Sequence, residues 1–180
     1  SDDILKPLSD ESGSVNPNLH IKMYQIYQIT YDLIVQETAQ DQVITTIDII
    51  NINKDLDASK VVSFTAEVNP NTECSNQMSI TDEWWIAKQI QVGDPYVGRI
   101  LKSNPIKPTA GKTYNYNMTL TAKDGYIFHA GIKYGHFCTV KCNGGETSAY
   151  RATLSDDQKE LTLYFEDIQV TATSGNTQQD

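Results

Sequence analysis

The chain has 180 residues, which fits one domain, or one domain with an extension, and is enough to bury a core without disulfide staples. Hydrophobic residues make up 39% of it, and Tyr, Thr, Val and Ile are plentiful, a bias that favours β-sheet. The net charge of -9 is spread along the chain without a basic stripe, so we expect neither nucleic acid nor an anionic membrane as a partner. No apolar run reaches the roughly 18 residues of a membrane span, and we expect no membrane insertion.

The N-terminal part of the chain differs in character from the rest. Residues 1 to 18 are rich in Ser, Asp, Pro and Asn, which is typical of a linker or arm. Residues 19 to 35 fit two patterns: apolar residues at nearly every odd position, as in a strand, and a helical face after an Asn16-Pro17 start signal. We therefore expect residues 19 to 42 to form an extension, either a long strand or a helix, that packs on the domain that follows.

Strand-like segments begin at residue 43. The segments "VITTIDIINI" and "KVVSFTAEV" are followed, after a turn, by "MSITDEWWIAK". Strict alternation in the last segment places Trp84 on the core face and Trp85, beside Glu83, on the polar face. Residues 89 to 107 are rich in Gly and Pro, and we expect a loop there with at most one short strand.

The second half of the chain carries the clearest pattern. Five apolar residues alternate with Asn and Thr over nine positions, which predicts a strand with one buried face. The turn "AKDG" and further strand-like segments follow, as far as "KELTLYFEDIQV". Regularly spaced strands with no clear helix between them predict an antiparallel β-sandwich over residues 43 to 171, with a polar tail at 172 to 180. The five predicted core residues are Tyr114, Tyr116, Met118, Leu120 and Ala122.

The three cysteines allow at most one internal disulfide. In a strand, Cys138 and Cys142 would lie about 13 Å apart, too far to be bridged. Either Cys74 pairs with one of them or all three are reduced. His136 adds an H-x-C-x3-C pattern, but two sulfurs so far apart cannot close around one ion, so we expect no metal site.

No pattern in the sequence indicates catalysis. The chain has no nucleophile elbow, metalloprotease, phosphate-binding loop or C-x-x-C motif, and its three histidines fall in predicted strands or at their ends. Neighbouring carboxylates on a strand point to opposite faces and do not form an acid–base pair. We expect no catalytic residue and no cofactor. A small hydrolase that uses carboxylates of loop 89 to 107 is the third-ranked alternative.

The order of motifs resembles a known family. A Trp-bearing strand is followed by "AGKTYNYNMTLTAKDGYIFHA", then "CNGGETSAYRATL", then a closing strand that ends in aromatics. This pattern resembles the immunoglobulin-like modules of secreted and cell-wall-associated proteins of Gram-positive bacteria, well over residues 108 to 165 and loosely over 43 to 170. The loop at 89 to 107, the cysteines and residues 1 to 42 depart from the family pattern. The resemblance implies an immunoglobulin-like β-sandwich, an extracellular or cell-surface location and neighbouring domains of a larger chain, but no catalytic residues.

Three aromatic residues are not placed in the core by alternation. Trp85 follows Glu83 on the polar face, Tyr96 lies in the Gly/Pro loop, and Tyr134 lies between two glycines. Exposed rings on a rigid sandwich suit a glycan or a surface protein as ligand. We therefore expect a non-catalytic binding or adhesion module that uses Trp85, Tyr96, Tyr134 and Glu83. The alternative is a purely structural spacer, in which residues 19 to 35 cover and bury Trp85.

Overall fold

The computed structural model describes residues 40–88, 98–147 and 150–171. The chain divides into two compact units, Ser1–Gln40 and Asp41–Asp180, and the elements below belong to the second unit. The predicted arm and polar tail lie outside the described residues, as does the predicted extension except for its last residues. Gln42, expected to end the extension, lies in the first strand of the second unit.

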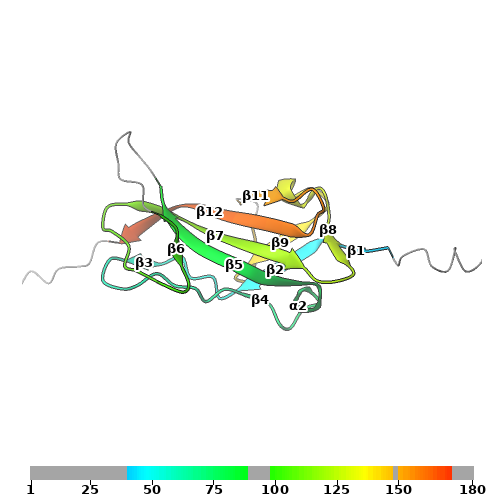
Figure 1. The fold of residues 1–180 in the computed structure, drawn as a ribbon, viewed down its shortest axis with the longest axis horizontal. Helices are drawn as coiled ribbons and strands as arrows, with labels where there is room; N and C mark the ends of the chain where they lie inside the picture. The colour runs from blue at the N-terminus through cyan, green and yellow to red at the C-terminus, as the bar shows by residue number, and fades with distance from the viewer. Residues whose placement is uncertain (1–39, 89–97, 148–149, 172–180) are drawn as a thin grey trace, which may run out of the picture. The chain divides into compact units, whose positions relative to one another are not determined.

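A large sheet forms one layer of this unit (Figure 1). Its strands lie in the order β11-β12-β7-β5-β6, and every pair in this order is antiparallel. A short strand, β3, pairs with the end of β12 in parallel. The bounds are Leu56–Asp57 for β3, Met78–Ala87 for β5, Ile100–Leu101 for β6, Thr113–Ala122 for β7, Arg151–Leu154 for β11 and Glu160–Thr171 for β12.

A smaller sheet, in the order β10-β9-β2-β4, forms the other layer. Here β2 and β9 pair in parallel, and so do β1 and β8, which form a separate two-stranded sheet. Two short helical turns, α2 and η2, join strands. The bounds are Gln42–Ile44 for β1, Thr46–Ile50 for β2, Glu67–Val68 for β4, Tyr126–Phe128 for β8, Thr139–Cys142 for β9, Gly145–Glu146 for β10, Cys74–Gln77 for α2 and Ile132–Tyr134 for η2.

The fold is thus all-β and sandwich-like, as predicted, but its sheets are mixed. The prediction of purely antiparallel pairing is wrong for β1 with β8, β2 with β9, and β3 with β12. Parallel neighbours are far apart in the sequence, so no hairpin turn signals them. None of the described helices is long and apolar enough to cross a membrane.

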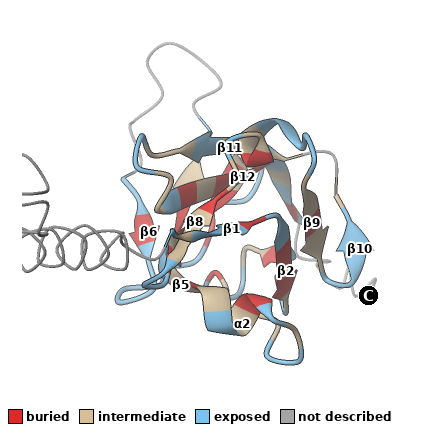
Figure 2. Ribbon diagram, turned by 90° about the vertical axis from the view of Figure 1, so that its right-hand side faces the viewer, coloured by how far each residue is buried: buried red, intermediate tan, exposed pale blue. Residues whose placement is uncertain are grey.

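The core lies between the two sheets, and Figure 2 shows buried residues on β2 and β12. Ile47 and Ile49 of β2 are fully buried and belong to one cluster with Leu161 and Leu163 of β12. The prediction for β7 is confirmed. Tyr114, Tyr116, Met118, Leu120 and Ala122 are all buried, because the side-chain period of two turns every second residue of an extended strand toward the other layer.

Strand β5 departs from strict alternation. Its register against β7 shifts between Ile80 and Asp82, which marks a β-bulge at this point. Beyond the bulge the odd positions face the core, so Trp85 lies opposite Tyr116 while Trp84 lies opposite Asn117 on the outer face. Both tryptophans are buried, but Trp85 belongs to the core cluster, whereas Trp84, which is 7% exposed, lies outside it. The prediction that Trp85 lies on the surface is therefore wrong, and the extra residue of the bulge is the reason.

Candidate functional site

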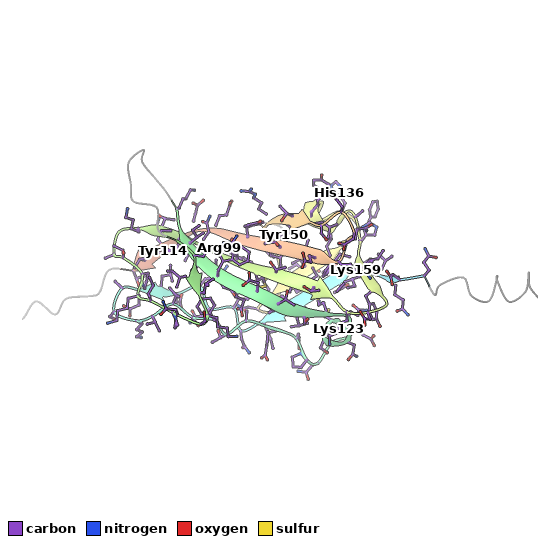
Figure 3. The ribbon with its side chains drawn as sticks, viewed as in Figure 1. Arg99, Tyr114, Lys123, His136, Tyr150 and Lys159 are labelled. Carbon is purple, nitrogen blue, oxygen red and sulfur yellow. The ribbon has the colours of Figure 1, made fainter. Side chains whose placement is uncertain are left out.

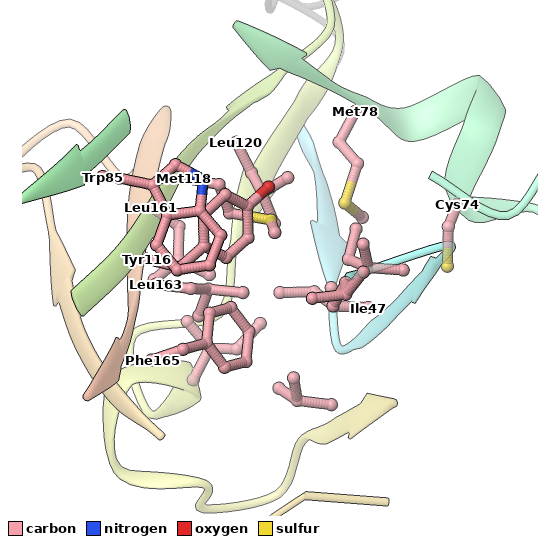
Figure 4. Packing of buried hydrophobic residues seen from close by; sticks show 14 of the residues in the cluster. Ile47, Cys74, Met78, Trp85, Tyr116, Met118, Leu120, Leu161, Leu163 and Phe165 are labelled. Carbon is pink, nitrogen blue, oxygen red and sulfur yellow. The ribbon is translucent and has the colours of Figure 1, made fainter. Parts of the chain in front are cut away.

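Trp85 is part of the core and contacts no ligand surface. Its side chain is fully buried, and its ring centroid lies 4.8 Å from that of Tyr116 (Figure 4). Its indole Nε1 donates a hydrogen bond of 2.9 Å to the carbonyl oxygen of Ser63, so the polar edge of the ring is also satisfied. In the spacer alternative, residues 19 to 35 bury this ring, but those residues lie outside the described ones. Among the described residues, the bulge in β5 turns the ring toward the core between the sheets.

Glu83 is buried as well, and the hollow that it lines with Lys102 is not the one that Tyr134 lines. Its Oε1 accepts a hydrogen bond of 2.5 Å from the hydroxyl of Tyr116, and its Oε2 lies 3.5 Å from Nζ of Lys102. Burial, then the hydrogen bond to Glu83 and its charge, raise the pKa of Tyr116 well above the usual range of a phenol. Each carboxylate oxygen thus has a partner within the domain, so the burial of Glu83 is compensated and the side chain serves the structure. Tyr96, and Asp94 of the hydrolase alternative, lie outside the described residues.

Of the predicted site residues, Tyr134 is the one that the structure describes as exposed. It lies in η2 on the loop of residues 129–138, and its side chain is 67% exposed. Phe137 of the same loop is 92% exposed, which is unusual for a phenylalanine. Phe137 also has a φ of 57°, in the left-handed region that large side chains avoid. Strained and exposed aromatics of this kind concentrate at functional surfaces.

The loop is held in shape by contacts at its base. The backbone N–H of Gly131 donates to Nδ1 of His129 at 2.9 Å, and the N–H of His136 donates to the Gly131 carbonyl at 3.1 Å. A Cβ at position 131 would lie 2.8 Å from the His136 oxygen, so only glycine allows this closure. The hydroxyl of Tyr150 donates to the Ile132 carbonyl at 2.7 Å and ties the loop to the segment before β11. Figure 3 marks His136 and Tyr150.

A groove of about 630 Å³ opens beside this loop. The loop and β9 supply its walls together with Glu146 of β10, Thr147 and Tyr150. Among the described residues, the side chains of Thr139, Glu146 and Thr147 make no hydrogen bond, although all three line the groove. Lys133 lies over the ring of Tyr134, with its Nζ 5.0 Å from the ring centroid. The groove therefore offers two free hydroxyls, a free carboxylate, an ammonium group and an aromatic ring within one concave surface.

All three cysteines are free thiols, which is the second of the two arrangements that the sequence left open. Cys74 is buried, and its Sγ lies 3.4 Å from the Thr46 carbonyl oxygen. Burial raises the pKa of Cys142 to about 11 and also raises the pKa of Cys138, which lines the groove. Both thiols therefore stay protonated near neutral pH and are poor nucleophiles and metal ligands. The described residues contain no group of three or more His, Cys, Asp or Glu placed to hold a metal ion.

Sequence reasoning missed most of this site. Phe137, Thr139 and Glu146 are not among the predicted residues, because the pattern of "HFCTVKC" predicts one continuous strand, whereas β9 begins only at Thr139. His136 accordingly lies in the loop and not in a strand. The signal available was the spacing of Gly131 and Gly135 around Tyr134, which indicates a tight loop between two strands.

Comparisons with protein-family models, curated protein sequences and solved structures find no match to this chain. The fold and the groove place the described unit among all-β, sandwich-like domains that carry a concave polar surface with aromatic residues at its rim.

Proposed function

We propose that the described unit is a non-catalytic, extracellular binding module with an immunoglobulin-like fold, and that it takes a glycan in the groove beside Tyr134. The observation that carries the proposal is the exposure of Tyr134 in a groove that Thr139, Glu146 and Thr147 also line, since these three side chains make no hydrogen bond to a described residue. An exposed aromatic ring beside polar side chains in one concave surface is typical of a ligand-binding site.

The chemistry of the groove fits a neutral sugar. Tyr134 presents a flat ring that can stack on the apolar face of a pyranose. Glu146 and Lys133 supply one negative and one positive charge, so the groove as a whole favours neither an anionic nor a cationic ligand. Thr139 and Thr147 add hydroxyls that both donate to and accept from sugar hydroxyls. An apolar peptide would leave these groups buried without partners, at a cost of about 1–3 kcal/mol each.

A glycan array tests this proposal with three proteins. The wild-type domain is expected to bind a neutral oligosaccharide. The Tyr134→Ala variant should lose about tenfold or more in affinity, the usual cost of truncating an aromatic anchor. Val61→Ala is the matched control, because Val61 is 53% exposed and does not line the groove. If the folded wild-type protein binds no glycan on the array, the glycan assignment is wrong. That result would favour the alternative of a purely structural spacer.

A further inference from the structure

The loop that carries Tyr134 and Phe137 is closed by a histidine acting as a hydrogen-bond acceptor. Nδ1 of His129 accepts the backbone N–H of Gly131 at 2.9 Å, which requires this nitrogen to carry no proton. Histidine is the side chain that changes protonation between about pH 5 and 8. A proton on Nδ1 would turn the acceptor into a donor that faces another donor, so the bond cannot persist.

This contact is one of several that hold the loop, beside the hydrogen bonds of His136 and Tyr150 at its base. The position of a Cβ at residue 131 is only 3.1 Å from Nδ1 of His129 and 2.8 Å from the His136 carbonyl, so the imidazole and the loop backbone close tightly around Gly131. The ring of His129 also lies against Phe137, at 6.4 Å between centroids. Phe137 has left-handed backbone geometry, which persists only while its surroundings hold it. Loss of the His129 contact therefore removes a support from both ends of the loop.

The charged groups on the elements that pack against β8 and the loop pair with one another. β1 and the turn before β12 pack against β8 and bring Asp41 and Lys159, which pair with each other at 2.8 Å. β11, which packs against η2, brings Arg151, and this arginine lies 3.3 Å from Glu166. On the loop itself the titratable groups are Lys133, which is cationic, and His136. No carboxylate among the described residues forms an ion pair with His129.

We propose that His129 is a pH-sensitive lock on the binding loop, and that its protonation opens the loop and lowers the affinity of the groove for its glycan. The effect on affinity rests on the proposed function, whereas the lock itself is a property of the free domain. His136 is the internal comparison: its ring lies 5.9 Å from that of Tyr134, and its side chain makes no hydrogen bond to a described residue.

The lock is tested first without ligand, by amide hydrogen exchange of the full chain at about pH 7.5 and about pH 5.5. After correction for intrinsic exchange rates, the Gly131 amide should lose protection at the lower pH in the wild-type protein. It should stay protected in His129→Asn, whose side-chain oxygen can take the place of Nδ1 and does not titrate in this range. His136→Asn should behave as wild type. Unchanged protection of Gly131 in the wild type, or the same loss in His129→Asn, would overturn the lock.

Affinity for the neutral oligosaccharide selected on the array is then measured by calorimetry at both pH values. The wild-type protein and His136→Asn should lose about five- to tenfold in affinity at the lower pH, the size of one hydrogen bond, and His129→Asn less than about twofold. An equal loss in His129→Asn would assign the pH effect to another group and overturn the proposal. If no oligosaccharide binds at either pH, the proposed function is wrong. The hydrogen exchange of the Gly131 amide still tests, without any ligand, whether His129 locks the loop.

Discussion

The hydroxyl of Tyr116 donates a hydrogen bond of 2.5 Å to Oε1 of Glu83 in the interior of the domain. Tyr116 packs between Trp85 and Phe165, with ring centroids 4.8 Å and 5.9 Å away, so the phenol has no access to water from these two sides. This pair joins β7 to β5 at the place where the bulge has turned Glu83 inward. It places a polar contact in the core, beside the ring of Trp85.

The Tyr116–Glu83 pair makes the domain sensitive to alkaline pH. Because burial raises the pKa of Tyr116, the folded state keeps a proton that the unfolded chain releases above about pH 10. The free energy of unfolding should therefore be unaffected by this group below about pH 10 and fall as the pH rises above it. Urea denaturation at about pH 8 and about pH 11 measures the fall, which should be smaller in Tyr116→Phe.

Cys142 contributes in the same direction, since its pKa is raised from 9.0 to about 11, so the comparison is made in a Cys142→Ala background. If the alkaline loss of stability in that background is as large with the Tyr116→Phe substitution as without it, the role given to this phenol is contradicted.

Trp85 should be far more important for stability than the exposed aromatics. Trp85→Ala removes a fully buried ring and leaves a cavity, and should lower the free energy of unfolding by about 3–5 kcal/mol. Tyr134→Ala should change it by less than about 0.5 kcal/mol, because that ring is mostly exposed. Urea denaturation of the two variants checks this. A Trp85→Ala variant as stable as Tyr134→Ala would show that Trp85 lies on the surface after all.

The sequence predicted the strands of this fold better than their faces. The period of two in residues 114 to 122 identified the buried side of β7 correctly, because that strand runs without interruption. The same rule failed in β5, where a single extra residue between Ile80 and Asp82 exchanged the faces of Trp84 and Trp85. A bulge is set by pairing with a neighbouring strand, and nothing local in "SITDEWW" signals it.

Asn143 connects the turn after β9 to the end of β2 through both atoms of its amide. Its Oδ1 accepts the Ile52 N–H at 2.9 Å, and its Nδ2 donates to the Ile52 carbonyl at 2.8 Å. Asn143→Asp keeps the acceptor but places a second oxygen against the carbonyl, and should cost about 1–3 kcal/mol of stability by urea denaturation. Asn53→Asp is the control, since the only side-chain hydrogen bond of Asn53 to a described residue is at its Oδ1, which accepts the Asp55 N–H at 3.0 Å. Equal effects of the two changes would contradict this account of Asn143.

Gly131 should be required for binding more than for folding. In Gly131→Ala the new Cβ would meet the His136 carbonyl at 2.8 Å, a backbone atom, so the loop itself must shift. We expect a loss of about tenfold in glycan affinity, the scale of losing one anchor contact, with cooperative melting retained. Gly98→Ala is the matched control, because a Cβ there meets nothing within 4 Å. Normal affinity in Gly131→Ala would show that the closed loop does not shape the site.

The candidate site was predicted only at Tyr134, and the reason is again physical. The groove joins η2, β9 and β10, and it forms because β9 pairs in parallel with β2 while the loop before it folds back on His129. Such a surface depends on contacts between distant segments. Hydrophobic periodicity reports only which side of a strand is buried, so it cannot indicate that Thr139 and Glu146 line the same groove as Tyr134.

The most direct test of the account is to map where a neutral oligosaccharide from the array contacts the ¹⁵N-labelled domain, by following backbone amide chemical shifts during a titration. We predict that the shifts concentrate on the loop of residues 129–138, on β9 and on Glu146 and Thr147, and that Tyr134→Ala abolishes them. Shifts concentrated on the outer face of the large sheet, around Trp84 and Tyr164, would contradict the assignment of the groove as the binding site.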